Sequence, residues 1–273
     1  PESAGIVEDG KMPIDRAVAS AVLAAEHAGR HDLPWTRHQD VANDAEWRMT
    51  VVGEIDEAIK KDQLWVAYQP KHDLRTSQNT GAEALIRWTH PERGPIRPDQ
   101  FIPILEDAGR IESLTSFVLR NAIRDFADFD GLSVAVNIST RMLGRDVIRK
   151  TVAEALAEYG LAPELLTLEV TESAEIASDQ SVVELEELRA MGVKISIDDY
   201  GTGQSTLNYL RKLPAHELKI DQSFVRNMDK NKSDQAMISS TIALAHQLGL
   251  SVVAEGVETL EIMDALRALE CDI

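Results

Sequence analysis

Short apolar runs with alternating polarity recur along most of the chain. In one of them Val134, Val136 and Ile138 alternate with smaller or polar residues. Successive side chains of a strand point to opposite faces, so such a run predicts a strand with one apolar and one polar face. Seven runs of this kind begin near Leu64, Ala82, Leu132, Leu165, Val193, Glu217 and Ser251. The apolar faces need a covering layer, and the polar faces are left to point toward a common interior.

Helical periodicity fills most intervals between these runs. The segments 145–159, 182–191 and 233–248 carry apolar residues at helical spacing, and a glycine follows each of them. Strand and helix therefore alternate from about residue 130 onward. Such alternation predicts parallel strands joined by crossover helices that pack on the apolar faces of the strands.

The first two runs depart from this alternation. A polar loop separates the run at 64–69 from the run at 82–88, and it is shorter than the dozen or so residues that a parallel crossover needs. We therefore expect an antiparallel hairpin there, within an α/β fold of the modified TIM type, a (β/α) barrel with an antiparallel first strand. Cys271 falls where an eighth strand would begin, and we expect the barrel to be truncated before that last strand.

Most of these runs also end on a side chain that could hold a metal ion or a phosphate. These residues are Glu83, Asn137, Glu169, Asp198 with Asp199, Lys219 and Glu255. An unpaired buried charge costs several kcal/mol unless a cation or hydrogen bonds compensate it, so the recurrence predicts one shared site. Placement of functional residues at the carboxyl ends of many strands favours a barrel over an open sheet. Taken singly, Glu83 could be a solvated edge residue, and Lys219 could pair with Asp221 on the strand face.

The composition excludes several classes of protein. A net charge of −18 disfavours binding to long nucleic acid, whose affinity comes largely from lysine and arginine on phosphates. No apolar run approaches the roughly 20 residues that cross a bilayer, and no signal peptide is visible, so we expect no membrane insertion in this segment. The single Cys271 cannot form an internal disulfide. We expect a cytoplasmic domain, either free or as the cytoplasmic part of a larger membrane-attached protein.

Seven ordered motifs resemble those of EAL-domain cyclic di-GMP phosphodiesterases. They are YQP at 68–70, EAL at 83–85, NIS at 137–139, EVTES at 169–173, DDYGTG at 198–203, LKID at 218–221 and AEGVE at 254–258. A single tripeptide would carry no weight, whereas seven motifs in order and in matching strand context do. Nearer the N-terminus, AEHAGR resembles the final helix of GGDEF diguanylate cyclase domains. The expected organisation is a GGDEF-like remnant at 1–33, a linker at 34–45 and an EAL-type barrel at 46–273.

The resemblance implies a metal-dependent phosphodiesterase. Such an enzyme would open cyclic di-GMP to the linear dinucleotide pGpG by in-line attack of water, using two Mg²⁺ or Mn²⁺ ions, and would act as a homodimer. Carboxylate and amide oxygens without histidine or cysteine suit these hard cations. Two of them about 3.5 to 4 Å apart can activate a water and stabilise charge on the phosphate.

The resemblance also implies a role for each site residue. The metal ligands would be Glu83, Asn137, Glu169, Asp198, Asp199 and Glu255. Catalysis would depend on Glu83, Asp198, Lys219 and Glu255. Substrate contacts would come from Gln69, Leu85, Arg87 and Asn137. Glu172 and Glu258 would support these groups without touching the metals, Glu172 by tethering the loop after Asp199.

Other interpretations remain open at this stage. A module that binds cyclic di-GMP without cutting it is the main alternative, although it would have less need for every acidic ligand and Lys219. A metal-dependent barrel enzyme of another superfamily, such as the enolases, fits the carboxylates but not the ordered motifs. Glu258 stands at a predicted helix start, where its charge favours the helix dipole, and Glu172 could be a local cap. Tyr200 and Gln204 stand where the family would carry phenylalanine and often tyrosine, which concerns regulation more than catalysis.

Overall fold

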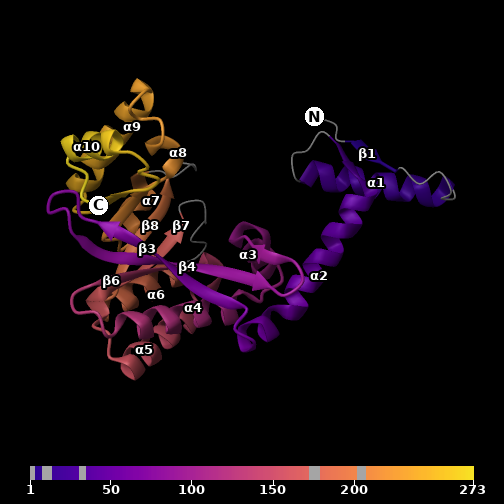
Figure 1. Cartoon of the computed structure of the whole chain (residues 1–273), viewed down its shortest axis with the longest axis horizontal. Helices are drawn as coiled ribbons and strands as arrows, with labels where there is room; N and C mark the ends of the chain where they lie inside the picture. The colour runs from indigo at the N-terminus through magenta and orange to yellow at the C-terminus, as the bar shows by residue number, and fades with distance from the viewer. Residues whose placement is uncertain (1–3, 8–13, 31–34, 172–178, 202–206) are drawn as a thin grey trace.

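A curled, mainly parallel sheet forms the centre of the protein. The computed structural model describes residues 4–7, 14–30, 35–171, 179–201 and 207–273. The strands are β3 (Leu64–His72), β4 (Asn79–His90), β5 (Gly94–Ile96), β6 (Ser133–Asn137), β7 (Leu166–Thr171), β8 (Lys194–Tyr200), β9 (Glu217–Ile220) and β10 (Ser251–Ala254). Their order is β10-β9-β8-β7-β6-β4-β3, with β5 paired to β4 (Figure 1). All neighbours from β4 to β10 along this order are parallel, and β3 pairs antiparallel with β4. The predicted antiparallel first strand is confirmed.

Helices lie between the strands and cover the outer side of the sheet. They are α3 (Pro98–Asp107), α4 (Ile111–Phe126), α5 (Val147–Tyr159), α6 (Asp179–Ala190), α7 (Leu207–Lys212), α8 (Gln222–Val225), α9 (Lys232–Gln247) and α10 (Leu260–Ala268), with the 3₁₀ turns η1 (Thr140–Met142) and η2 (Pro163–Leu165). The three helices expected from apolar spacing correspond to α5, α6 and α9 within a few residues. Among the described helices, none is both long enough and apolar enough to pass through a membrane.

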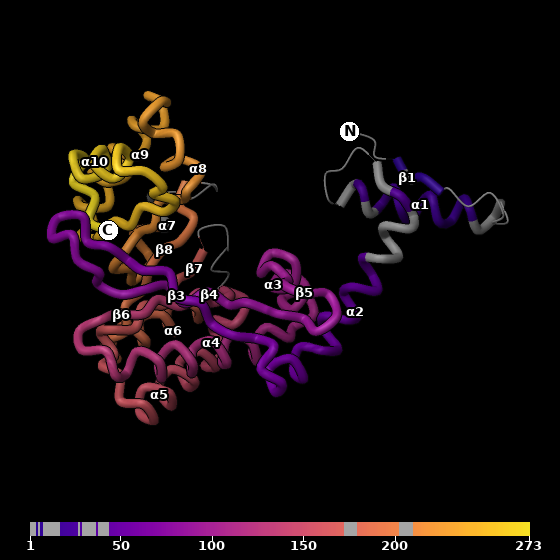
Figure 2. The backbone as a smooth tube through the Cα atoms, viewed as in Figure 1, coloured from indigo at the N-terminus to yellow at the C-terminus, as the bar shows by residue number. Residues whose placement is uncertain are grey.

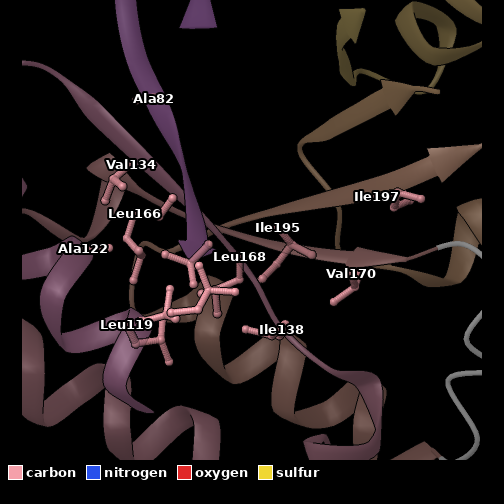
Figure 3. Packing of buried hydrophobic residues seen from close by; sticks show 14 of the residues in the cluster. Ala82, Leu119, Ala122, Val134, Ile138, Leu166, Leu168, Val170, Ile195 and Ile197 are labelled. Atoms are coloured by element: carbon pink, nitrogen blue, oxygen red, sulfur yellow. The ribbon is translucent and has the colours of Figure 1, made fainter. Parts of the chain in front are cut away.

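The outward faces of the strands form the core. Figure 3 shows Val134, Leu166 and Leu168 of neighbouring strands packed against Leu119 and Ala122 of α4. All five side chains are fully buried. Burial of a Leu or Val side chain contributes about 1.5 to 3 kcal/mol, so this layer holds α4 to the sheet. It also orients each strand, because the alternate residues must then face the interior of the barrel.

The last residues of the chain lie between the two edges of the curled sheet. Ile273 donates its N–H to Val252 O at 3.0 Å, and Ala254 donates its N–H to Ile273 O at 2.9 Å, as in a strand beside β10. On the other side Leu74, just after β3, donates its N–H to Asp272 O at 2.9 Å. Residues 272 and 273 therefore occupy the place expected for an eighth strand and connect β10 to the β3 edge.

The N-terminal part lies outside the barrel. It consists of β1 (Ala4–Ile6), α1 (Ile14–Arg30) and β2 (Trp35–Arg37), and the two strands pair parallel as a separate small sheet. The long helix α2 (His38–Lys60) joins this part to the barrel, as Figure 2 shows. It begins within the segment expected to be a linker and ends at Lys60, and three residues separate it from the first residue of β3. Val51 and Ile55 of α2 are fully buried in the main core, so its second half belongs to the barrel.

Candidate functional site

Four carboxylates from four different strands meet at one lysine. Lys219 Nζ on β9 lies 3.1 Å from Glu83 Oε2, 3.0 Å from Glu169 Oε2, 3.1 Å from Asp198 Oδ1 and 2.6 Å from Glu255 Oε1. Glu83, Glu169 and Asp198 stand within β4, β7 and β8, and Glu255 directly follows β10. The curl of the sheet brings these four side chains together, although Glu83 is not at the end of its strand.

Asp221, the alternative ion-pair partner considered for Lys219, caps a helix instead. Asp221 is the N-cap of α8, where its Oδ1 accepts a hydrogen bond from the N–H of Ser223 at 2.9 Å. None of the ion pairs within the described part of the chain joins Lys219 to Asp221. Lys219 therefore belongs to the interior cluster.

Asn137 extends the cluster toward β6. Its Nδ2 donates a hydrogen bond of 2.7 Å to Glu83 Oε1, while Lys219 holds the other oxygen of the same carboxylate. Both oxygens of Glu83 are therefore held in place. Gln69 lies directly opposite Glu83 in the β3–β4 register, which puts the predicted substrate contact beside the predicted ligand.

A second interior lysine was missed by the reasoning from sequence. Lys71 Nζ lies 3.0 Å from Glu169 Oε1 and 3.0 Å from Glu217 Oε1, and the Lys71 side chain is only 8% exposed. Glu217 was missed as well, although the alternation of strand side chains indicated an inward direction for both residues. Lys71 is two positions after Gln69, and Glu217 is two positions before Lys219, so each shares an inward face with a residue that was identified.

An irregularity in β8 allows two consecutive aspartates to serve one site. The pairing of β8 with β9 shifts between Ile197 and Tyr200, and Asp199 has a left-handed backbone with φ of 56°. Strict alternation would send Asp199 away from the interior, whereas a bulge can redirect a side chain. Oxygens of Asp198, Asp199 and Glu255 lie within 4.8 Å of one another. A non-glycine residue in this conformation costs energy, and such strain is common at functional sites.

The interior carboxylates outnumber the ammonium groups that face them. Burial, and then the neighbouring Glu169, raises the pKa of Glu83 to about 7, against the attraction of Lys219. Burial likewise raises the pKa of Asp198 and of Glu255. Burial alone would raise the pKa of Glu169 too, but Lys219 and Lys71 lower it. The rim of the cluster is therefore short of positive charge, while its centre is balanced.

The donor set fits a hard divalent cation. Every candidate ligand is a carboxylate or amide oxygen, which is the chemistry preferred by Mg²⁺ and Mn²⁺. Asp198, Asp199 and Glu255 have oxygens close enough together to bind one ion. Burial raises the pKa of Asp198 and of Glu255 more than the shared Lys219 lowers it. Glu83, Asn137 and Glu169 are the other oxygen donors around the same lysine.

Two cavities adjoin the cluster and meet at Leu85. One, of about 600 Å³, is lined by Gln69, Glu83, Lys219 and Glu255 among others. The other, of about 630 Å³, is largely apolar and is lined by the predicted substrate residues Arg87 and Asn137. Leu85 lines both. The predicted substrate residues are therefore divided between two neighbouring hollows.

Of the two residues expected to support the site, Glu172 and Glu258, the structure describes only Glu258. Glu258 lies at the edge of the first cavity, where it is largely exposed and pairs with Arg226 at 3.4 Å. The N-cap of α10 is Thr259, whose hydroxyl accepts the N–H of Ile262, and Glu258 directly precedes this cap, at the expected helix start. Glu172 and Gln204 lie outside the described residues.

Comparison with known sequences identifies a family and several relatives. The model of the EAL domain matches residues 52–273. The bifunctional diguanylate cyclase/cyclic di-GMP phosphodiesterase MucR of Pseudomonas aeruginosa is 39% identical over 259 residues, which are 93% of this chain and 38% of MucR. The cyclic di-GMP phosphodiesterase NbdA of the same organism is 43% identical over 226 residues, which are 81% of this chain and 29% of NbdA. The chain thus spans about a third of the length of these curated relatives.

Solved structures show the same architecture. The PaMucR phosphodiesterase in complex with c-di-GMP superposes with a TM-score of 0.76 at 41% identity, covering 82% of this chain and 93% of that one. The EAL enzyme Bd1971, with cAMP and cyclic di-GMP bound, gives a TM-score of 0.79 at 29% identity, covering 86% and 67%.

Proposed function

Because the chain belongs to the EAL domain family, we propose that it is a phosphodiesterase that hydrolyses cyclic di-GMP to linear pGpG with the help of two Mg²⁺ or Mn²⁺ ions. The observation that carries this proposal is the interior cluster in which Glu83, Glu169, Asp198 and Glu255 surround Lys219. Relatives named as cyclic di-GMP phosphodiesterases support the choice of substrate.

The acidic residues of the cluster would hold the metals. Asp198, Asp199 and Glu255 offer the tightest group of oxygens, and Glu83, Asn137 and Glu169 complete the set. When bound, such ions lower the pKa of water and stabilise negative charge on a phosphate. The protein supplies carboxylates whose positions are set by neighbouring strands of the barrel, so they would need little rearrangement before the reaction.

Lys219 is suited to stabilising negative charge. Burial alone would lower the pKa of this lysine, but the surrounding carboxylates, Glu169 first, raise it well above its usual value. While these carboxylates surround it the side chain carries a positive charge, which favours an electrostatic role over proton transfer. Its role would be to hold the carboxylates in place against their mutual repulsion and to neutralise charge that develops on the phosphate.

The two cavities would receive the two halves of the substrate. Cyclic di-GMP is a symmetric molecule with two guanine bases on one phosphate-sugar ring, and the hollows on either side of Leu85 match that division. Gln69 lines the first and would contact a base, whereas Arg87 lines the second and would contact a phosphate. We extend the proposal to a homodimer acting in the cytoplasm, as the resemblance to the family implies.

A turnover assay tests this function directly. Purified protein would be incubated with cyclic di-GMP and Mg²⁺, with and without EDTA, and the product separated by chromatography. We expect pGpG to accumulate only with the metal, and an Asp198→Asn variant to remain inactive. Binding of cyclic di-GMP without any product would instead identify a sensor module, and neither binding nor turnover would exclude the proposed substrate.

A further inference from the structure

Glu169 is held between two lysines that come from different strands. Its Oε1 lies 3.0 Å from Lys71 Nζ, and its Oε2 lies 3.0 Å from Lys219 Nζ. The Glu169 side chain has no exposed surface. A carboxylate with an ammonium group on each oxygen has little freedom to rotate, so the two lysines together determine its orientation.

The two lysines do not have the same surroundings. Lys219 faces four carboxylates at the upper part of the cluster, whereas Lys71 faces only Glu169 and Glu217. Lys71 stands on β3, which runs antiparallel to β4, and its Cα partner on β4 is Gly81, two residues before Glu83. It therefore approaches Glu169 from the side away from Asp198 and Glu255.

We propose that Lys71 is a positioning residue for the metal site. By holding Glu169 Oε1, it keeps Oε2 turned toward Lys219 and the other acidic ligands, where that oxygen can take part in binding a cation. Without Lys71 only the oxygen at Lys219 is held, so the plane of the carboxylate is free to rotate and a ligand of the site loses its orientation. The inference rests on the proposed function only in that the cation site is taken to be that of the phosphodiesterase.

The alternative is a purely structural role, in which Lys71 only neutralises Glu217. In that case Lys71 and Glu217 form a buried ion pair whose presence or absence leaves the cation site unchanged. Replacement of both members of such a pair by apolar residues of similar volume is often neutral for stability, while removal of one member leaves an uncompensated charge. Replacement of Lys71 and Glu217 together therefore conserves the net charge of the interior while it removes their ion pair and the contact to Glu169.

The test is a titration of the protein with Mn²⁺ in the absence of substrate, in which electron paramagnetic resonance measures the free and bound ion. The double variant Lys71→Met/Glu217→Met is expected to bind Mn²⁺ about 10-fold more weakly than the unmodified chain, since loss of a group that orients a ligand typically costs 10 to 100-fold in metal affinity. The matched control Glu217→Gln keeps Lys71 on Glu169 and is expected to change the affinity by less than about 3-fold. Melting curves in EDTA verify that both variants fold.

A second comparison assigns the effect to Glu169. If Lys71 acts through this carboxylate, the double variant should lose no further affinity in a Glu169→Gln background. Unchanged Mn²⁺ affinity in Lys71→Met/Glu217→Met, or equal losses in that variant and in Glu217→Gln, would overturn the proposal. So would an unmodified chain that binds no Mn²⁺. Failure of the phosphodiesterase function alone would appear as absent turnover with intact Mn²⁺ binding, and it would leave the assignment of Lys71 standing.

Discussion

Lys219 and Glu255 meet in the barrel interior with the lysine Nζ 2.6 Å from the glutamate Oε1. The Cα partner of Lys219 on β10 is Val253, so Glu255 is two residues farther on and on the same face. The ion pair therefore joins the buried Lys219 to Glu255, which is half-buried and lies nearer the open end of the barrel.

Replacement of Asp198 by asparagine should abolish most activity without loss of the fold. Burial raises the pKa of this aspartate and, together with Glu169, outweighs the attraction of Lys219, so the folded protein disfavours its charge. We expect less than a tenth of the normal rate of hydrolysis, because metal-site contributions are worth several kcal/mol. The melting temperature in EDTA should be unchanged or higher. Turnover above a tenth of the normal rate would exclude Asp198 as a metal ligand.

Ca²⁺ should occupy the site but support turnover poorly. All candidate ligands are oxygens, which Ca²⁺ also accepts, yet it binds at about 2.3 to 2.6 Å with looser geometry than Mg²⁺. We expect at least a 10-fold lower rate with saturating Ca²⁺ than with Mg²⁺ or Mn²⁺, while cyclic di-GMP still binds. The comparison needs rates and binding isotherms for each ion. Equal rates with Ca²⁺ and Mg²⁺ would contradict a site that depends on the placement of metal-bound water.

His216 should make the protein less stable in mild acid. Burial, followed by Arg189 and Lys194, lowers the pKa of this imidazole, whose Nδ1 accepts the N–H of Ile195 at 3.1 Å. Below about pH 6.5 the unfolded chain takes up a proton that the folded protein resists, so stability falls as the pH decreases. Asparagine at 216 can accept the same hydrogen bond without titrating. The difference in melting temperature between pH 7.5 and 5.5 should be smaller for His216→Asn; identical differences would show that this histidine does not titrate on unfolding.

Gly81 should tolerate no side chain. A Cβ built on this residue would lie 2.2 Å from the carbonyl oxygen of Ser133, across the β4–β6 pairing that carries Glu83 and Asn137. Gly81→Ala should therefore force the strands apart and lower the melting temperature by several degrees, with a loss of activity. Gly53→Ala, within α2, is the matched control. A Cβ there meets nothing within 4 Å, and alanine should stabilise the helix by up to about 1 kcal/mol. Equal melting temperatures for the two variants would mean that β4 and β6 can adjust.

Alternation of polarity was enough to predict the strands and the inward direction of Glu83, Glu169 and Lys219. That information is local, because each strand side chain points opposite to its neighbour and an apolar face must be covered. The short loop before β4 was likewise enough to predict the antiparallel hairpin, since a crossover would not fit. The ordered motifs added the family and the set of candidate ligands.

The tertiary structure decided which inward side chains touch. Lys71 and Glu169 are 98 positions apart, and their contact depends on how far the sheet curls and on the register of β3. Asp199 joins Asp198 only because the β8–β9 pairing shifts, a departure from strand periodicity that no local pattern of polarity encodes. The two cavities at Leu85 depend in the same way on packing between β4, α4 and the segment after β10. Side-chain direction follows from the residue's place in its own strand, whereas contacts across the barrel follow from the registers of all the strands together.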